Sequence, residues 1–351
     1  MDNVRAAVVG CGAVSNDHVK AWRKVKYAEV VAVLDLNESL ARKTAAEWGV
    51  PNYYTSLSDM LEKEKVDVVD ICTPPHTHAS LAVQAMEAGK AVLIEKPMAI
   101  TVSDAKEIVD CQKKTGVKAG VIHNWLFDPP VLETRAIVEK GLLGEIISIE
   151  VEALNTKEDA MAANQNHWCH KLPGGRFSEM LAHPIYLTSH FLGNEIEVCD
   201  VYACKLNGYP WMKFDELHVL FRVEKKLGRT YASFNSPRDA IYLGLYGTEG
   251  IIRLELINSI LNILPRRATQ RFSKALDSIR QAGQIVKWTL NDALKVALKR
   301  WMSGHDMCIK LFAESVVKDC EPPISVSEGL SVVRVLEDIC RKIENVDRVN
   351  G

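Results

Sequence analysis

The chain has 351 residues, 47% of them hydrophobic and 25% charged, with 20 glycines and 13 prolines. A single hydrophobic core seldom grows past about 250–300 residues, so this length predicts two domains, and the composition excludes disordered, collagen-like and coiled-coil proteins. The 43 basic and 45 acidic residues leave a net charge of −2, so we expect no nucleic-acid partner.

The cysteines and the first residues bear on the cellular compartment. Nine cysteines are scattered without a C-x-x-C pair, and most lie in apolar runs, where a reduced thiol behaves as a small hydrophobic group. No export signal is visible after Met1, and no apolar run approaches the roughly 20 residues of a membrane-spanning helix. We therefore expect a cytoplasmic protein.

In residues 1–124, short apolar runs rich in β-branched residues alternate with segments of helical spacing. Runs that are apolar almost throughout are typical of parallel strands buried on both faces. The pattern predicts an N-terminal Rossmann domain with a doubly wound parallel sheet. The predicted strands are Val4–Val9, Val30–Leu34, Val66–Ile71, Ala91–Ile94 and Lys118–Ile122, and the predicted helices include Glu38–Trp48, His78–Ala88 and Val102–Thr115.

From residue 125 on, one helix over 130–140 is followed by strand-like segments separated by turn residues. They predict a second α/β domain, residues 125–351, with a large, open and mostly antiparallel sheet. A last helix over 326–344 can pack back on the first domain. The predicted strands are Glu145–Ala153, Val198–Lys205, Glu216–Val223, Thr230–Asn235, Ala240–Tyr246 and Ile251–Leu256.

The segment 265–300 has nine basic and two acidic residues, a local charge of +7. Apolar residues recur there at helical spacing, which predicts one or two amphipathic helices. The simplest interpretation is a helical face that covers the sheet. Binding of an anionic substrate group, a partner subunit or an acidic membrane surface are the alternatives.

A glycine-rich turn follows the first predicted strand directly and opens a helix: Gly10-Cys11-Gly12-Ala13-Val14-Ser15. Gly10 permits a tight turn, and Gly12 lets the backbone approach a pyrophosphate that rests on the helix N-terminus. Asp35 ends the second strand, where a carboxylate can bind the adenosine ribose and repel a 2′-phosphate. The motif predicts NAD rather than NADP, and the alternative is a turn that only joins strand to helix.

Two further strand ends are expected at the same edge of the sheet. We expect Thr73 and Pro74 to line the nicotinamide, with His78 and Glu95 also on the cofactor side. His76 and His78 can be metal ligands, but such a pair without a third partner more often caps and packs. No metal is expected.

Several segments together match a known family in order. They are the glycine turn, Thr73-Pro74-Pro75 with His78, Ala88-Gly89-Lys90, Glu95-Lys96-Pro97, Leu143-Gly144-Glu145-Ile146, Gly174-Gly175 with His183, and Pro322-Pro323-Ile324-Ser325-Val326. With them the chain resembles, over nearly its whole length, the glucose-fructose oxidoreductase / inositol dehydrogenase / rhizopine-catabolism (Gfo/Idh/MocA) family. The resemblance implies an NAD(P)-dependent dehydrogenase acting on a CH–OH group of a sugar, cyclitol or sugar derivative, and a homo-dimer or homo-tetramer.

Hydride leaves a carbinol only if its hydroxyl loses a proton, so a base must stand near the nicotinamide. Lys96, at the end of a strand and before Pro97, is the candidate that holds or polarises the substrate oxygen. The alternative is an exposed lysine that merely follows a strand.

The candidate general acid/base is His183. The family pattern is a glycine loop followed by Asp-x-Gly-x-His, and this chain departs from it at Pro173, Glu179 and Leu181. Glu179 lies one helical turn before His183 and can orient it or bind a substrate hydroxyl. We expect Lys96 and His183 to converge on the redox face of the cofactor; the alternative for His183 is a satisfied buried histidine.

Further substrate contacts are expected from Asn124, Trp168 and Arg176. A zinc site at 167–170 is rejected, because structural zinc needs four well-spaced ligands. The basic segment would fit an anionic or nucleotide-linked sugar. Two alternative functions stay open: an NAD-retaining enzyme of the oxidation–elimination glycosidase or epimerase type, and a non-catalytic NAD-binding regulator.

Overall fold

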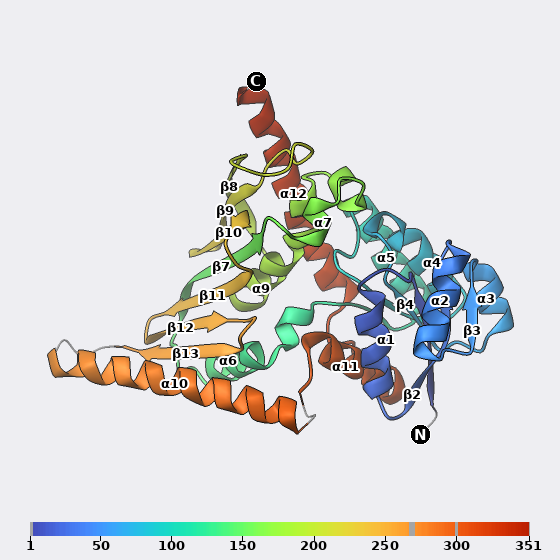
Figure 1. Ribbon diagram of the computed structural model, residues 1–351, viewed down its shortest axis with the longest axis horizontal. Coiled ribbons are helices and arrows are strands. Elements are labelled where there is room, and N and C mark those ends of the chain that lie inside the picture. The colour runs from blue at the N-terminus through green and yellow to red at the C-terminus, as the bar shows by residue number, and fades with distance from the viewer. Residues whose placement is uncertain (1–2, 267–270, 299–300, 351) are drawn as a thin grey trace. The chain divides into compact units, whose positions relative to one another are not determined.

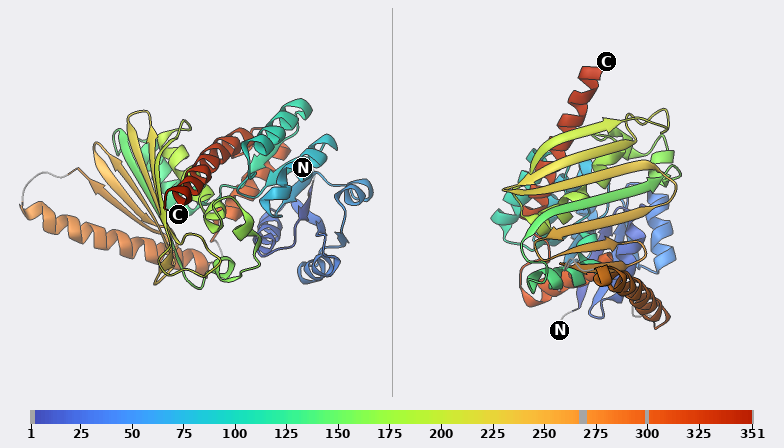
Figure 2. Two further views of the ribbon diagram at one scale, coloured as in Figure 1. Left: turned by 90° about the horizontal axis from the view of Figure 1, so that it is seen from above. Right: turned by 90° about the vertical axis from the view of Figure 1, so that its left-hand side faces the viewer.

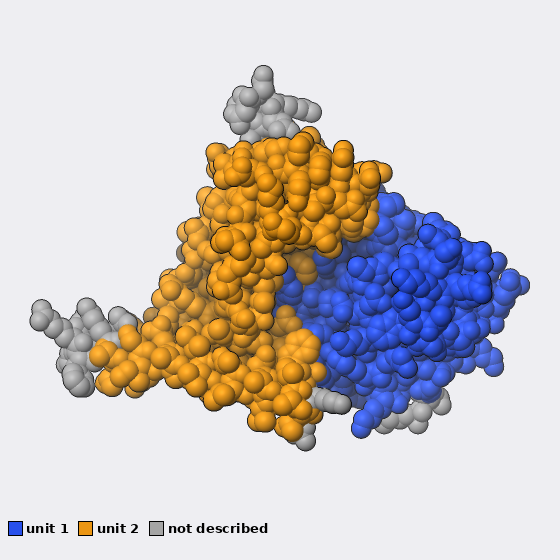
Figure 3. Space-filling view, viewed as in Figure 1, with its two compact units in different colours: residues 1–127, 302–334 blue, residues 128–301, 335–351 orange. Residues whose placement is uncertain are grey.

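The computed structural model describes residues 3–266, 271–298 and 301–350. Contacts divide the chain into two compact units, coloured separately in Figure 3. Unit 1 comprises residues 1–127 and 302–334, and unit 2 comprises residues 128–301 and 335–351. The sequence predicts a boundary after residue 124 and one continuous second domain, whereas the contacts return residues 302–334 to the first unit.

Unit 1 contains a parallel six-stranded sheet in the order β3-β2-β1-β4-β5-β6. Strands β2, β3 and β4 of this sheet are labelled in Figure 1. The predicted Rossmann architecture is therefore confirmed. Strand β3 was not predicted, because it has only three residues and none is buried. The strands are β1 (Val4–Val9), β2 (Ala28–Leu34), β3 (Asn52–Tyr54), β4 (Val68–Ile71), β5 (Ala91–Ile94) and β6 (Ala119–Val121).

The helices of unit 1 end where the sequence supplies stop signals. Gly49 and Gly116 take left-handed conformations just after α2 and α5, which glycine adopts without strain. A capping box between Ser303 and Asp306 starts α11, which packs against α1. The helices are α1 (Ser15–Lys24), α2 (Glu38–Trp48), α3 (Leu57–Lys63), η1 (Pro75–Thr77), α4 (His78–Glu87), α5 (Val102–Thr115), η2 (Asn124–Phe127) and α11 (Gly304–Lys318).

The last helix, α12 (Val326–Asn350), is shared between the units, with residues up to 334 in unit 1. A Cβ atom on Gly329 would lie 2.7 Å from Met98 Sδ and 2.8 Å from Val121 Cγ2. This glycine therefore lets the start of α12 approach the edge of the Rossmann sheet.

Unit 2 contains a seven-stranded sheet in the order β13-β12-β11-β7-β10-β9-β8, seen face-on in Figure 2. All neighbouring strands are antiparallel except the central pair β7 and β10, which is parallel, so the sheet is mixed. Strand β13 was not predicted. The strands are β7 (Ile146–Thr156), β8 (Glu197–Cys204), β9 (Glu216–Val223), β10 (Lys226–Ser236), β11 (Ala240–Gly247), β12 (Gly250–Glu255) and β13 (Ile260–Pro265).

One face of this sheet is buried and the other is largely exposed. Along β9, Leu217, Val219 and Phe221 are buried while Leu220 between them is exposed, as period-2 alternation requires. Helix α9 packs on the covered side against β7 and β10. The helices of unit 2 are α6 (Pro129–Glu139), α7 (Ala160–Ala163), η3 (Trp168–Lys171), α8 (Arg176–Met180), α9 (Ala182–Leu192) and α10 (Arg271–Ala297).

Within the basic segment, Arg271–Ala297 form one long helix, α10, beside the edge strand β13. The helix meets the sheet at this edge strand, and most of its large apolar side chains are exposed, while Trp288 is half-buried. Within the described ranges, no helix combines the length and the apolar character needed to cross a membrane.

Candidate active site

The glycine turn lies where the loops after β1 and β4 come into contact. Gly10 has φ +97°, and a Cβ atom there would lie 2.8 Å from the Cys72 carbonyl carbon and the Thr73 nitrogen, so only glycine fits. A Cβ atom on Gly12 would meet nothing within 4 Å. The space above the turn at Gly12 is therefore open to a ligand's phosphates.

Asp35 is fixed at the end of β2 by two backbone donors. The N–H groups of Cys11 and Asn37 donate to its carboxylate at 2.9 and 2.8 Å. Val14 at the start of α1 has no polar side chain to cap the helix, and the N-terminus of a helix favours an anion. Ser15, which replaces the third glycine, is buried and donates its hydroxyl to the Gly12 carbonyl at 2.6 Å. These residues fit a dinucleotide.

His78 connects the loop after β4 to the turn after β5. Its ring nitrogens lie 2.7 Å from the Thr73 carbonyl oxygen and 3.1 Å from the Pro97 carbonyl oxygen. The ring is completely buried, and burial lowers the pKa of His78. The hydroxyl of Thr77 donates to the Pro74 carbonyl at 2.9 Å and stiffens the same loop. The structure therefore gives His78 a positioning contact with both loops.

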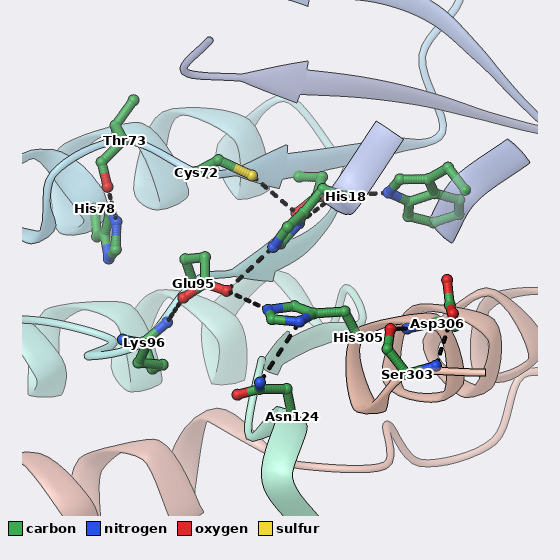
Figure 4. A network of polar contacts seen from close by, with 12 residues as sticks. His18, Cys72, Thr73, His78, Glu95, Lys96, Asn124, Ser303, His305 and Asp306 are labelled. Atoms are coloured by element: carbon green, nitrogen blue, oxygen red, sulfur yellow. Dashed lines mark hydrogen bonds and ion pairs between the residues drawn. The ribbon is translucent and has the colours of Figure 1, made fainter. Parts of the chain in front are cut away.

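Next to Lys96 lies a buried group of charged residues, shown in Figure 4. The two ring nitrogens of His18 lie 2.9 Å from an Asp70 carboxylate oxygen and 3.1 Å from Glu95 Oε1. We call His18, Asp70 and Glu95 the His18 cluster. Trp22 also donates its indole N–H to Asp70 at 2.7 Å. Each partner in the cluster thus satisfies the charge of another.

The His18 cluster extends to the surface through α11. His305 Nε2 lies 3.3 Å from Glu95 Oε1, and Asn124 Nδ2 lies 3.5 Å from His305 Nδ1. On the other side, the backbone N–H of Lys96 donates to Glu95 Oε2 at 2.7 Å. Glu95 therefore ties the turn that carries Lys96 to both α1 and α11, while the Lys96 side chain is half-exposed.

Electrostatics make His18 the cation of this cluster. Burial disfavours its charged form, but the Asp70 carboxylate outweighs burial and raises the pKa of His18 well above its usual value. Burial also opposes ionisation of Glu95, yet hydrogen bonds from His18 and His305 hold the pKa of Glu95 well below its usual value. Burial raises the pKa of the nearby Cys72 thiol to about 12. An imidazolium thus sits between two carboxylates.

The same atoms lie close enough together to hold a metal ion. His18 groups with Asp70 and Cys72, or with Glu95 and His305, with ligand atoms within 4.8 Å. Both ring nitrogens of His18 already lie within hydrogen-bond distance of carboxylate oxygens, of Asp70 and of Glu95. The arrangement therefore favours a hydrogen-bonded network. His167, Cys169 and His170 belong to neither group in the described part of the chain.

In unit 2, the glycine loop leads into α8 and α9 as expected. Gly174 and Gly175 have positive φ, and a Cβ atom on Gly174 would lie 2.9 Å from Ser178 Oγ. His183, in the first turn of α9, is buried, with its Nδ1 2.7 Å from the Tyr186 hydroxyl. Tyr186 therefore sets the orientation of the candidate acid/base.

Glu179 pairs with Arg176 one turn earlier on α8. Arg176 is nearly completely buried, and its Nε also lies 3.1 Å from Asp159 Oδ1. Burial opposes ionisation of Asp159, but its hydrogen bond with Arg176 lowers the pKa of Asp159. We call Asp159, Arg176 and Glu179 the Arg176 cluster. Its arginine is already paired with two carboxylates, and the ring of Phe234 lies 5.2 Å beneath the guanidinium.

Trp168 lies in the short helix η3, half-buried against the His167 ring at a centroid distance of 5.1 Å. His170, in the same helix, has its Nε2 3.0 Å from the Met161 carbonyl oxygen. The two histidines of this segment therefore support local structure around Trp168.

His18, Asp70 and His305 were not predicted as site residues. Asp70 could have been found, because a carboxylate inside the otherwise apolar strand β4 needs a buried partner. His18 occupies a buried position of α1 together with Val19 and Trp22. His305 carries no such signal, since 210 residues separate it from Glu95.

Comparisons with known proteins agree with this fold. The model of the oxidoreductase family with an NAD-binding Rossmann fold matches residues 4–123, and the model of the GFO/IDH/MocA C-terminal domain matches residues 131–253. Oxidoreductase P35 of Formosa agariphila is 28% identical over 263 residues, which cover 73% of this chain and 80% of that protein. D-apiose dehydrogenase of Paraburkholderia graminis is 33% identical over 140 residues, which cover 40% of this chain and 37% of that protein.

Among solved structures, the WlbA dehydrogenase from Bordetella pertussis, crystallised with NADH and UDP-GlcNAcA, has a TM-score of 0.80 at 22% identity. The match covers 98% of this chain and 96% of that chain, so the two share a fold. Together the two family models cover most of the sequence. The chain belongs to the GFO/IDH/MocA family of oxidoreductases, with its NAD-binding Rossmann fold in unit 1.

Proposed function

We propose that this dehydrogenase transfers hydride between NAD and a CH–OH group of a sugar, cyclitol or sugar derivative. The observation that carries the proposal is the setting of Lys96, which follows β5 at the edge of the sheet where the turns after β1 and β4 also lie. Ligands of open parallel sheets bind at this edge. The relation to D-apiose dehydrogenase supports a polyhydroxy substrate.

The cofactor preference rests on Asp35. Because two backbone N–H groups hold its carboxylate at the end of β2, the negative charge stays where an adenosine ribose would bind. A 2′-phosphate would be repelled there, and the next residues, Leu36 and Asn37, supply no cation. We therefore expect NAD to be preferred over NADP.

Each proposed site residue has a distinct task. NAD, when bound, supplies the hydride acceptor. Lys96 holds the substrate hydroxyl and takes or relays its proton, while the hydrogen bond from its N–H to Glu95 fixes the turn. His183, oriented by Tyr186, is the proposed second acid/base. Asn124 and Trp168 are the proposed substrate contacts.

Arg176 and Glu179 are proposed to act more indirectly. Since both are buried and paired with each other, they would keep α8, and hence the start of α9, in place. The proposed contribution of Arg176 to substrate binding is therefore to hold these helices in position.

The test is a substrate screen that follows NADH absorbance with polyols, aldoses, uronic acids and nucleotide sugars. Lys96→Met and His183→Ala are each expected to lower kcat by at least about 100-fold, with NADH affinity within about threefold of wild type. Lys90→Met, at the opposite end of β5, and His190→Ala, later on α9, are the matched controls. Full activity of both site variants on the substrate would refute the catalytic assignment.

The same assay separates the alternatives. A dehydrogenase releases one NADH for each oxidised substrate, whereas an NAD-retaining enzyme turns over without net NADH release. A protein that binds NADH but turns over no compound would point to a regulator. The expected homo-dimer or homo-tetramer stays a prediction for sedimentation analysis, and the cytoplasmic location stays a prediction for cell fractionation.

A further inference from the structure

Helix α10 lies along the free edge of the unit 2 sheet, beside β13, and extends past the end of that strand (Figures 1 and 2). Its 27 residues correspond to a rod of about 40 Å at 1.5 Å per residue. Neither family model reaches it, since the second one ends at residue 253. The proposed dehydrogenase function assigns no task to this helix.

The side of α10 that meets the sheet is mostly polar, with Trp288 as the half-buried apolar residue on it. Gln284 accepts a hydrogen bond from the Ile263 N–H at 2.6 Å and donates one to the Ile263 carbonyl at 3.1 Å. One amide side chain thereby satisfies both free backbone groups of that residue on the edge strand. Asp277, two turns earlier on the same side, has a carboxylate only 14% exposed. The need of the edge strand for polar partners thus orients the helix.

The opposite side of α10 is apolar and exposed. Five large side chains recur at spacings of three, four or seven residues and so form one stripe along the helix. Their exposed fractions range from 46% to 68%. An apolar stripe of this length on the outside of a folded domain marks an interaction surface. The stripe consists of Leu276, Ile279, Val286, Leu290 and Leu294.

Cations flank this stripe. Arg280 and Lys287 follow stripe residues Ile279 and Val286 directly, while the acids of the segment, Asp277 and Asp292, lie on the half-buried side. The segment 265–300 carries +7, so the other residues together carry −9. The apolar stripe and its neighbouring cations lie on an otherwise negative chain. They are complementary to a partner surface with an anionic outer layer and an apolar layer below it.

We propose that α10 docks on the surface of an anionic lipid bilayer, lying in the plane of the interface. The stripe would enter the boundary between headgroups and acyl chains, and lipid phosphates would balance Arg280 and Lys287. The helix lies on the bilayer and does not span it.

A second copy of the chain fits the stripe less well. If two α10 helices packed stripe to stripe in antiparallel fashion, Arg280 and Lys287 of one would face the same cations of the other. In a parallel pair, these cations would face Ala275 and Ala282, which are neutral. Arg280 lies 3.9 Å from Asp277 of its own helix, but neither arrangement adds a carboxylate from the partner helix, whereas anionic lipids supply phosphate along the whole helix.

The experiment is flotation of the full-length protein, loaded with NADH, with vesicles of phosphatidylcholine alone or with about 30 mol% phosphatidylglycerol. The wild type is expected to float with the anionic vesicles at least about tenfold more than with the neutral ones, and to release at high salt. The double variant Ile279→Glu/Leu290→Glu is expected to lose binding. Arg280→Gln/Lys287→Gln is expected to bind anionic vesicles roughly tenfold to thirtyfold more weakly.

Two controls match these changes away from α10. Leu142→Glu alters an exposed leucine in the loop before β7, and Lys114→Gln alters an exposed lysine at the end of α5. Both are expected to float like the wild type, and NADH binding and circular dichroism check that every variant is folded. The proposal is overturned if the wild type does not float, or if the stripe variant floats equally well. In that case, sedimentation of the wild type and the stripe variant is compared. A smaller assembly for the stripe variant would mean that a second copy of the chain, and not a bilayer, covers the stripe.

Discussion

The two units each bury one cation between two carboxylates, yet the His18 cluster and the Arg176 cluster are built in different ways. The Arg176 cluster comes from a stretch of 21 residues, whereas the His18 cluster joins α1 to strand β4 and to the turn after β5. Arginine stays charged at any pH that a folded protein tolerates, but an imidazolium can lose its proton. The same charge pattern is therefore permanent in unit 2 and pH-dependent in unit 1.

The largest expected effect comes from removing the permanent cation. Arg176→Met would leave two carboxylates without a counter-charge, the buried Glu179 and the half-buried Asp159. Breaking a buried pair in this way costs about 3–5 kcal/mol of unfolding free energy. Urea unfolding at neutral pH measures the loss. Arg222→Met, which breaks an exposed pair with Glu197, is the control, and a much smaller loss is expected there. Equal losses in both variants would contradict the buried-charge argument.

The next effect concerns pH and separates the two clusters. Because the folded-state pKa of His18 is raised, its stabilisation is complete below the unfolded value of about 6.5 and is lost as pH rises through the folded pKa. Glu95 has a lowered folded-state pKa, so its contribution is present above about 4.3 and is lost as pH falls through the folded pKa. Stability from this cluster is therefore greatest between these two unfolded values.

The measurement compares urea unfolding of wild type and His18→Asn from about pH 6 upward. The unfolding free energy of the wild type should fall as pH rises. The variant should be less stable than the wild type near pH 6, and its unfolding free energy should depend less on pH. Arg176→Met, which leaves the His18 cluster intact, should keep the wild-type slope. Parallel slopes for wild type and His18→Asn would rule out His18 as the titrating cation.

The smallest expected effect lies at the half-exposed end of the network. His305→Leu removes one of the hydrogen bonds to Glu95 while His18 and the Lys96 N–H remain. A loss of about 1 kcal/mol is expected. Unfolding measurements check it against His190→Leu, an exposed histidine on α9. A loss as large as that of Arg176→Met would mean that His305 holds the cluster together.

Local sequence predicted much of the nucleotide site. A glycine at position 10 and a carboxylate at position 35 follow from a turn and a strand end, which are properties of a few neighbouring residues. The partners of Glu95 could not be predicted in this way, because His18 and His305 reach it only after the sheet and α11 have assembled. The pairing of Glu179 with Arg176 likewise depends on burial, which the spacing of the two residues does not reveal.

For helix α10, the sequence predicted the helix but not its orientation. Its apolar period and its positive charge are local properties, so the sequence by itself determined that an amphipathic basic helix forms. Which side faces outward was decided only by the tertiary structure. The edge strand β13 exposes backbone groups that need hydrogen bonds, and Gln284 on the polar side satisfies the N–H and carbonyl of Ile263, which leaves the apolar stripe facing away from the sheet.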